Sequence, residues 1–345
     1  MDLQELAQKH LHKRSLLSDL LLPLGGLNSA VQSLRRNRMK GWQAPCKVIS
    51  VGNLGSGGSG KTPFCIYLAT LLQEMGLKVG LSHRGCGGSR ENVPSLVSNR
   101  REIVLGVEDS GDEAQLLAQK LPGMPVVVGK RRVSAVSLLL SEFPDLDVVI
   151  LDDGFQHLKI ARDLDLVCFD AKLGLGNGRV IPSGWLREPL AALKSADALV
   201  LIQKEGGTTF GSNLPATARN ALKCEFKAVD FVDTQGNTVF LDLLKDRELV
   251  LLSSIAVPES FEDSVRALGL AWKRHFRFAD HHAFSRREDL EKVFQALGAE
   301  TVLLCTEKDL SKLALHECLN PLALRMKLEC ADEGRLKRLI QDRIL

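Results

Sequence analysis

The chain has 345 residues, of which 45% are hydrophobic and 25% charged, and its formal net charge is only +3. This length predicts two domains, and the composition is typical of a globular protein. The small charge and an aromatic content of 5% argue against a nucleic-acid-binding protein, which concentrates basic and aromatic residues on one face.

Cysteine usage and hydropathy exclude further classes. The eight cysteines form no C-x-x-C pair and no cluster with histidines, so we expect free thiols in a reducing compartment rather than disulfides or a zinc site. No apolar run reaches the roughly 18 residues that a membrane-spanning helix needs. The acidic start, Met1 to Glu5, does not resemble a secretory signal.

Residues 1–40 form a segment of their own. It contains a leucine cluster and, after it, apolar residues at helical spacing followed by basic ones: Leu16, Leu17, Leu20, Leu21, Leu22, then Leu27, Val31, Leu34, then Arg35, Arg36, Arg38 and Lys40. Short amphipathic helices with a basic rim can lie in a membrane interface. They can equally pack on the protein's own core, and the pattern alone leaves both possibilities open.

From residue 41 onwards the pattern becomes α/β. Continuous apolar runs predict strands at 47–51, 77–81, 125–128, 147–151, 164–169 and 198–202. Such runs separated by helices predict a mostly parallel sheet with helices on both faces, over residues 41–223. Residues 224–245 predict a β-hairpin linker with its turn at 233–237. A smaller α/β domain is expected over 246–345, with strands at 248–252 and 301–305.

The strongest motif lies between the first strand and a helix predicted at about 61–75. It fits G-x-x-x-x-G-K-[ST] with Gly55, Ser56, Gly57, Gly58, Ser59, Gly60, Lys61 and Thr62. Glycines let backbone N–H groups wrap phosphates at a helix N-terminus. Lys61 is expected to reach the β- and γ-phosphates and the Thr62 hydroxyl to bind Mg²⁺. The domain is therefore predicted to be a P-loop NTPase-type domain that binds ATP and Mg²⁺.

A second motif supports the first. The apolar strand 147–151 leads into Asp152 and Asp153, an arrangement that places a carboxylate beside the metal of a P-loop enzyme. The predicted metal ligands are Thr62, Asp152 and Asp153. Ordinary turn carboxylates remain the alternative for the pair.

Further strings together resemble one family, the tetraacyldisaccharide 4′-kinases of lipid A biosynthesis. They are Val51-Gly52-Asn53-Leu54 with Pro63, Arg84-Gly85-Cys86-Gly87, Gly111-Asp112-Glu113, Asp152-Asp153-Gly154-Phe155-Gln156-His157, Leu175-Gly176-Asn177-Gly178-Arg179, Pro182-Ser183-Gly184-Trp185-Leu186-Arg187-Glu188-Pro189, Phe278-Ala279-Asp280-His281-His282 and Thr306-Glu307-Lys308-Asp309. The chain departs from the family's usual residues at Cys86, Ala114, 183–185 and 253–258, which bears on fine substrate or nucleotide contacts.

The resemblance implies a reaction and a place. The γ-phosphate of ATP would go to the 4′-hydroxyl of a tetraacyldisaccharide 1-phosphate, at the cytoplasmic face of the bacterial inner membrane. The expected partners are this acylated lipid and the membrane surface, with no nucleic acid and no obligate protein partner. Residues 1–40 would dock on the membrane, with Leu17, Leu20, Leu21 and Leu27 inserted and Arg35, Arg36 and Arg38 at the headgroups.

The resemblance also implies roles for single residues. Asp112 would take the proton of the sugar hydroxyl, His281 would orient or tune Asp112, and Lys61 completes the catalytic set. Lys308 and Asp309 would contact the nucleotide. For Asp112 the alternative is an N-cap of a helix at 113–120, and for His281 an ordinary surface or core histidine.

The expected substrate-binding residues are Arg84, Asn177, Arg187 and His157. Arg131 and Arg132 join Arg84 and Arg187 as candidates for anchoring the 1-phosphate or the transferred phosphoryl group. A solvated face is the alternative for each arginine. For Lys308 and Asp309 the alternative to a nucleotide contact is a salt bridge within their loop.

Two other functions compete with a lipid kinase. A P-loop GTPase switch or metallochaperone would carry N-K-x-D or T-K-x-D, or a Cys/His cluster. Here Thr306-Glu307-Lys308-Asp309 has its lysine one position late. A soluble small-molecule kinase would not need the apolar and basic segment at residues 1–40.

Overall fold

The computed structural model describes residues 11, 14–55, 59–204, 216–255, 258–279, 282, 284, 287–298, 300–313, 316 and 319–345. The chain divides into two compact units. The first comprises 1–203, 208–224 and 330–345, and the second comprises 204–207 and 225–329. Ser56, Gly57, Gly58 and His281, all singled out in the sequence, lie outside the described residues.

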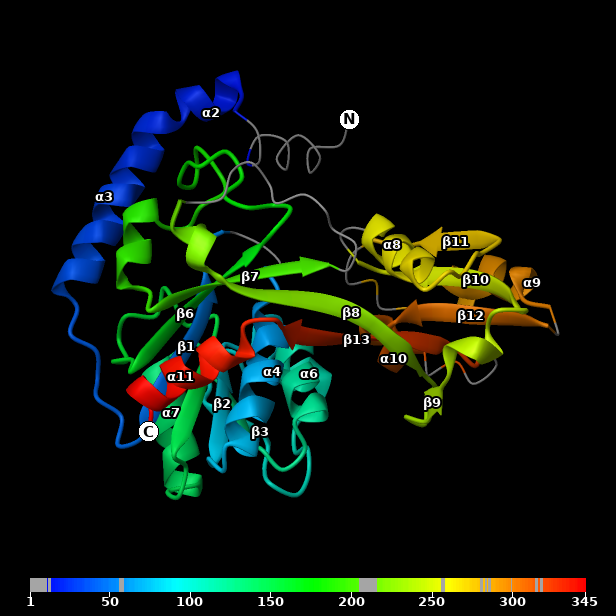
Figure 1. The fold of residues 1–345 in the computed structure, drawn as a ribbon, viewed down its shortest axis with the longest axis horizontal. Coiled ribbons are helices and arrows are strands. Elements are labelled where there is room, and N and C mark those ends of the chain that lie inside the picture. The colour runs from blue at the N-terminus through cyan, green and yellow to red at the C-terminus, as the bar shows by residue number, and fades with distance from the viewer. Residues whose placement is uncertain are drawn as a thin grey trace. The chain divides into compact units, whose positions relative to one another are not determined.

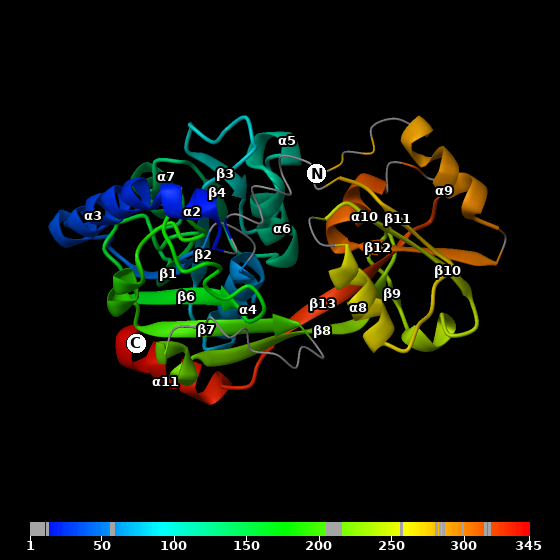
Figure 2. The same ribbon diagram turned by 90° about the horizontal axis from the view of Figure 1, so that it is seen from above.

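The first unit is built on a mostly parallel sheet (Figures 1 and 2). Its strands are β1 (Lys47–Asn53), β2 (Val79–His83), β3 (Ser95–Ser98), β4 (Val126–Val128), β5 (Val148–Asp152), β6 (Leu164–Asp170) and β7 (Ala198–Lys204). They lie in the order β7-β6-β1-β5-β2-β4-β3, and only β3 runs antiparallel to its neighbour. The strands β1, β2, β4 and β5 are buried almost throughout, because helices cover both faces.

Helices cover the two faces of this sheet. They are α4 (Lys61–Glu74), α5 (Val107–Ser110), α6 (Asp112–Lys120), α7 (Arg132–Glu142) and α11 (Glu333–Arg343), with 3₁₀ turns η1 (Leu190–Ser195) and η2 (Ala216–Asn220). Helix α7 packs Ala135, Val136 and Leu139 on Val149 and Leu151 of β5. Helices α4 and α6 contact each other, with α4 packed on β1, β5 and β2 and α6 packed on β4 and β3. Since Val149 and Leu151 point toward α7, the alternate residues of β5 face α4.

Two further helices, α2 (Leu16–Leu20) and α3 (Leu22–Arg38), precede the sheet. Helix α3, blue in Figures 1 and 2, runs along the outside of the first unit. The large apolar side chains of both helices are between 45% and 89% exposed: Leu16, Leu17, Leu20, Leu22, Leu24, Leu27, Val31 and Leu34. These helices therefore do not pack their leucines on the protein's own core. None of the helices described here combines the length and the apolar character needed to cross a membrane.

Helix α3 faces the protein with small and polar residues instead. A Cβ on the buried Gly25 would lie 2.9 Å from both Ser183 Cβ and Val180 O. Asn28 donates to Ile181 O at 2.9 Å. Arg36, three turns beyond Gly25, is largely buried and cannot meet lipid headgroups, which corrects the expectation for this residue. Arg35 and Arg38 are exposed.

The second unit holds a smaller sheet in the order β11-β10-β12-β13-β8, with β9 beside β8. Its elements are β8 (Leu222–Val232), β9 (Thr238–Val239), η3 (Leu241–Leu243), β10 (Glu248–Ser253), α8 (Glu259–Ala267), β11 (Arg274–Arg277), η4 (Arg287–Leu290), α9 (Glu291–Ala296), β12 (Thr301–Thr306), α10 (Glu307–Leu313) and β13 (Leu322–Cys330). The pairs β10–β11, β10–β12 and β12–β13 are parallel. Phe231 pairs with Val239 across the predicted hairpin, which is confirmed.

The boundary of the second unit differs from the predicted domain. The hairpin belongs to this unit rather than forming a separate linker, and residues 330–345 return to the first unit instead of ending the second. In α11 the buried residues are Leu336 and Ile340, and Tyr67 Oη of α4 donates to Glu333 Oε2 at 2.8 Å. An amphipathic helix carries no mark of which sheet it will cover, so its place was not predictable.

Candidate active site

The P-loop turn connects β1 to α4. Gly60 is the N-cap of α4 and has a φ of 74°, the left-handed conformation that favours glycine. A Cβ at Gly60 would lie 2.8 Å from Ile202 Cδ1, so the turn leaves no room for a side chain. Lys61 and Thr62 begin the helix, where backbone N–H groups lack partners inside the helix and favour an anion.

Beneath the turn, Thr62 contacts the acidic end of β5. Thr62 Oγ1 donates to Asp152 Oδ2 at 3.0 Å, and both side chains are buried. The other carboxylate oxygen, Asp152 Oδ1, is buried with no hydrogen-bond partner among the described residues, and so is Ser59 Oγ. A buried carboxylate oxygen without a partner is costly, and a hard cation such as Mg²⁺ would satisfy it.

The two neighbouring aspartates differ in their electrostatics. Burial raises the pKa of Asp152, because the charged form is removed from water. Burial also acts to raise the pKa of Asp153, but Lys61 and Arg187 outweigh it and hold that pKa below its usual value. A cation bound beside Asp152 would therefore favour its ionised form, as Lys61 and Arg187 do for Asp153.

Asp153 is the centre of a small ion-pair network. Arg187 Nη1 lies 2.9 Å from Asp153 Oδ2 and 3.1 Å from Oδ1, and Lys61 Nζ lies 3.5 Å from Oδ1. Asp153 has a φ of 53°, which is unusual for a residue with a Cβ. The structure therefore brings together Lys61, Asp153 and Arg187, which the sequence placed in three separate motifs.

Arg132 bonds to the carboxyl end of β5. Its side chain is buried, donates to the backbone carbonyl of Asp152, and lies 3.1 Å from Ser82 Oγ. Burial lowers the pKa of this guanidinium to about 10, still well above neutral pH. Arg132 thus bonds to the protein backbone. It is buried, whereas an arginine that binds a lipid phosphate would have to be accessible to the substrate.

The structure adds a histidine–carboxylate pair that the sequence analysis missed. His83 ends β2, is buried, and its Nε2 lies 2.9 Å from Glu113 Oε2, while its Nδ1 accepts from Gly85 N at 3.0 Å. The hydrogen bond from His83 lowers the pKa of Glu113. Glu113 also interacts electrostatically with Lys61, so the pair belongs to the same site. The available signals were a histidine at a strand end and the presence of Glu113 in the Gly111-Asp112-Glu113 string.

Asp112 is the first residue of α6. Gly111, with a φ of 82°, occupies the N-cap position and no side chain caps this helix end. The interpretation of Asp112 as the N-cap is therefore wrong. A Cβ at Gly111 would lie 2.4 Å from Cys86 O, so the loop after β2 is packed closely against the residue that precedes Asp112.

The remaining candidates are placed as follows. Arg84 is exposed and its Nε donates to Glu91 Oε1 at 2.8 Å. Asn177 is buried, donates to Ser183 O at 2.9 Å and accepts from Arg179 N at 3.0 Å, so it braces its own loop. Burial lowers the pKa of His157 to about 4 with help from nearby cations, including Arg132, so its imidazole is neutral at pH 7.

Lys308 and Asp309 lie in the second unit, at the start of α10. Asp309 is fully buried, accepts from Ser254 N at 3.0 Å and from Thr306 Oγ1 at 2.7 Å, and also accepts from the Ser254 hydroxyl. Its carboxylate therefore ties β10, β12 and α10 together. Lys308 is half-buried.

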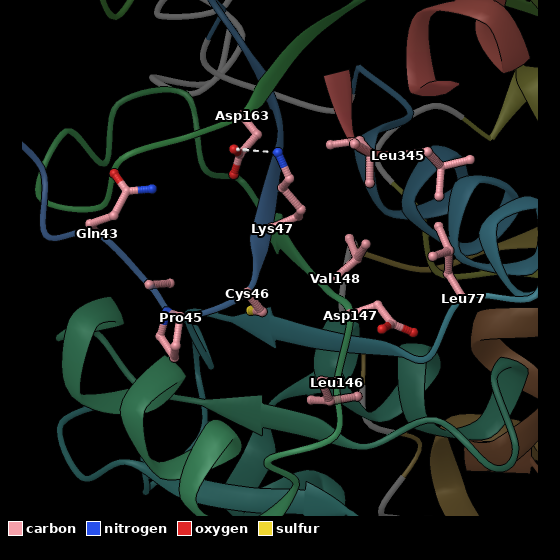
Figure 3. Close-up of a pocket in the computed structure, with 12 residues that line it drawn as sticks. Gln43, Pro45, Cys46, Lys47, Leu77, Leu146, Asp147, Val148, Asp163 and Leu345 are labelled. Carbon is pink, nitrogen blue, oxygen red and sulfur yellow. Dashed lines mark hydrogen bonds and ion pairs between the residues drawn. The ribbon is translucent and has the colours of Figure 1, made fainter. Parts of the chain in front are cut away.

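A cavity of about 520 Å³ occurs elsewhere on the first unit (Figure 3). It is lined by Cys46 and Lys47 at the amino end of β1, by Asp147 and Val148 at that of β5, and by Leu345. Lys47 Nζ lies 3.3 Å from Asp163 Oδ1 there. Since the P-loop follows the carboxyl end of β1, this cavity is at the opposite edge of the sheet from the site described above.

Comparisons with known proteins identify the family of the chain. The family model for tetraacyldisaccharide-1-P 4′-kinase matches residues 17–345. A tetraacyldisaccharide 4′-kinase of Desulfatibacillum aliphaticivorans is 36% identical over 314 residues, 88% of this chain and 84% of that protein. One from Geobacter sulfurreducens is 40% identical over 272 residues, 78% of this chain and 75% of that protein.

A solved structure is similar over nearly the whole chain. It is an "apo" form of LpxK from Aquifex aeolicus in complex with ATP, 31% identical, with a TM-score of 0.80 over 96% of this chain and 100% of that one. The family model, the relatives and this structure lead to the same family. The chain belongs to the tetraacyldisaccharide-1-P 4′-kinase family.

Proposed function

We propose that this chain, an ATP-dependent kinase of the lipid A precursor, works at a membrane surface with Lys61, Thr62, Asp152 and Asp112 as its central residues. The reaction moves the γ-phosphoryl group of ATP to the 4′-hydroxyl of tetraacyldisaccharide 1-phosphate and releases ADP and a proton. One observation carries the assignment of the site. Asp152 Oδ1, which has no hydrogen-bond partner in the described part of the chain, lies beside Thr62 under a phosphate-binding turn, in a chain of this family.

The residues at the turn would act by placing positive charge. Backbone N–H groups at the start of α4 and the Lys61 ammonium stabilise negative charge on the transferred group. Thr62 and Asp152 would hold Mg²⁺, which shields the charge on the phosphate oxygens. Asp153 keeps Lys61 and Arg187 beside each other, so both cations are fixed before the substrate binds.

Asp112 is proposed as the group that receives the hydroxyl proton. Its place at the first position of α6, beside the His83–Glu113 pair, supports this role. A carboxylate is a weak base toward an alcohol, but the proton can leave late in a loose phosphoryl-transfer transition state. The partnership of His281 with Asp112 stays a prediction. If they act as a unit, the double variant should be little slower than the slower single variant.

Helices α2 and α3 support peripheral docking at the membrane, which we place at the cytoplasmic face of the inner membrane. Their leucines point away from the protein, as the exposures between 48% and 89% show. Contiguous exposed apolar surface of this kind is unfavourable in water and typical of an interface with lipid. Such docking would bring the acylated substrate to the protein while its acyl chains stay in the membrane.

The test is a radiolabel transfer assay with purified protein, γ-labelled ATP and tetraacyldisaccharide 1-phosphate in mixed micelles. We expect Mg²⁺-dependent label in the lipid, separated by thin-layer chromatography. If the protein hydrolyses GTP in a parallel reaction but puts no label into the lipid, a GTPase switch would be favoured. Equal labelling of a disaccharide without acyl chains would favour a soluble sugar kinase. Flotation with anionic vesicles tests the membrane part separately.

A further inference from the structure

One buried ion pair joins helix α3 to the loop that carries Arg187. Arg36 Nε lies 2.9 Å from Glu188 Oε2, and Arg36 Nη2 lies 3.1 Å from Glu188 Oε1. The two side chains are only 12% and 4% exposed. A two-pronged arginine–carboxylate pair fixes direction as well as distance, so the end of α3 has a defined orientation against this loop.

Arg36 also holds a second segment of the site. Its Nη2 donates to Phe155 O at 3.0 Å, and its guanidinium carbon lies 4.2 Å from the centroid of the Phe155 ring. A third group, Nη1, donates to Ser195 Oγ at 2.8 Å. Arginine stacks on aromatic faces while its N–H groups bond in the guanidinium plane. One side chain thus contacts both Glu188 and Phe155.

These two contacts flank the central ion pair of the active site. Glu188 follows Arg187 directly, and Phe155 stands two residues after Asp153. Arg187 Nη1 is 2.9 Å from Asp153 Oδ2, and Lys61 Nζ is 3.5 Å from Asp153 Oδ1. Arg36 therefore clamps the two chain segments whose separation determines whether Arg187 reaches Asp153.

We infer that Arg36 and Glu188 are positioning residues for phosphoryl transfer, which link the lipid-facing helix α3 to the Arg187–Asp153–Lys61 network. The inference rests on the proposed function of this site. Among the described residues, the printed partners of this pair lie outside the nucleotide turn, so the two residues would act through Arg187 and Asp153. A displacement of about 1 Å in such a network can cost a large factor in rate without loss of binding.

A purely structural role is the competing explanation. In that case the pair would only fasten α3, and activity would fall only as far as folded protein is lost. A positioning role instead lowers kcat per folded molecule while the KM for Mg-ATP changes little. A double variant separates the two roles. It removes both charges, so no buried charge is left unpaired to destabilise the fold, and any remaining loss of kcat reports positioning.

The experiment compares Arg36→Met, Glu188→Gln and the double variant Arg36→Met with Glu188→Gln. The control is Arg100→Met with Asp145→Asn, a pair of the same geometry whose side chains are 39% and 40% exposed. Arg100 forms an equally two-pronged pair with Asp145, at 2.7 and 3.0 Å, and lies over the Phe143 ring, before the amino end of β5 and away from the P-loop. All proteins are assayed at saturating lipid in mixed micelles, with rates normalised to nucleotide-binding sites.

We expect roughly tenfold lower kcat in both single variants and in the double variant, with the KM for Mg-ATP within about twofold. The Tm should fall in the single variants and recover in the double variant, and the control should keep wild-type kcat. A double variant with restored Tm and wild-type kcat per site would overturn the inference. The inference would also be overturned if the lower rates of the single variants returned to the wild-type value once they are normalised to nucleotide-binding sites.

The same assay separates this inference from the proposed function. If the wild-type protein puts no label into the lipid, the proposed function itself is wrong. If the wild type labels the lipid and the pair variants match it, only the positioning role fails. Arg36→Lys adds a check, since lysine keeps the charge but loses the two-pronged geometry, and we expect its kcat to lie between those of Arg36→Met and wild type.

Discussion

Helices α3 and α4 are both leucine-rich, yet they orient their apolar residues in opposite ways. Helix α4 buries Phe64, Leu68 and Leu72 completely against the sheet. Helix α3 exposes Leu24, Leu27 and Leu34 and turns Gly25, Asn28 and Arg36 toward the protein. Hydropathy alone therefore does not tell which side of a helix meets its own protein. What distinguishes α3 is that its inner face is bonded by polar groups.

The largest expected effect concerns the N-terminus of α4, where Lys61 begins the helix. Lys61→Ala should lower kcat by roughly 10²- to 10³-fold, because it removes a positive charge that stabilises the transferring phosphoryl group. Binding to anionic vesicles should stay at the wild-type level, since α3 is untouched. The measurements are steady-state kinetics and vesicle flotation. Loss of flotation in this variant would mean that the two helices do not have separate tasks.

The next effect compares one leucine from each helix. Leu68→Ala should lower the free energy of unfolding by about 2–3 kcal/mol, because it leaves a cavity in a closed core. Leu27→Ala should change it by less than about 0.5 kcal/mol in water, because the side chain is already 64% exposed. Urea unfolding of both variants checks this. Equal destabilisation would show that Leu27 is buried in solution.

A third experiment asks what the outward leucines of α3 do contact. Leu20→Ala combined with Leu27→Ala should weaken partitioning into anionic vesicles by roughly tenfold, since each side chain gives up part of its burial in the lipid interface. The KM for Mg-ATP should be unchanged. Leu173→Ala is a suitable control, because Leu173 is a 40% exposed leucine outside α2 and α3. A similar loss with the control would point to nonspecific adsorption.

The smallest effect concerns His157, whose pKa is lowered from 6.5 to about 4 by burial and by cations that include Arg35 of α3. Its folded-state pKa lies below the unfolded value, so its contribution to stability is complete above pH 6.5 and is lost as the pH falls toward about 4. NMR titration of the ring should show a neutral imidazole at pH 6. A midpoint near 6.5 would contradict this, and Arg35→Gln should raise the midpoint slightly.

Much of the nucleotide end was predictable from the sequence. Gly60, Lys61, Thr62 and Asp152 follow from local rules, because a strand, a glycine turn and a helix fix their own geometry. Every strand predicted in the first sheet is present, although β3 was missed because it is short and antiparallel. The predicted strands at 248–252 and 301–305 are also confirmed, as β10 and β12.

The supporting contacts were not predictable, because they join residues far apart in the chain. Arg36 and Glu188 are separated by 152 positions, and His83 and Glu113 by 30. Neither pair has a spacing that a helix or strand would reveal. The return of α11 to the first sheet was missed for the same reason. The burial of Arg132 against the Asp152 carbonyl was not predictable either, because a sequence does not report burial.

Gly25 gives α3 a single axial position on the protein. Its missing side chain makes a notch that fits over Val180 and Ser183, where any Cβ would come within 2.9 Å. A slide by one helical turn, about 5.4 Å, would bring Leu21 or Ser29 into that notch, and neither fits. The 17-residue helix, about 25 Å long, therefore cannot shift by a turn along its axis while it stays in contact with Val180 and Ser183.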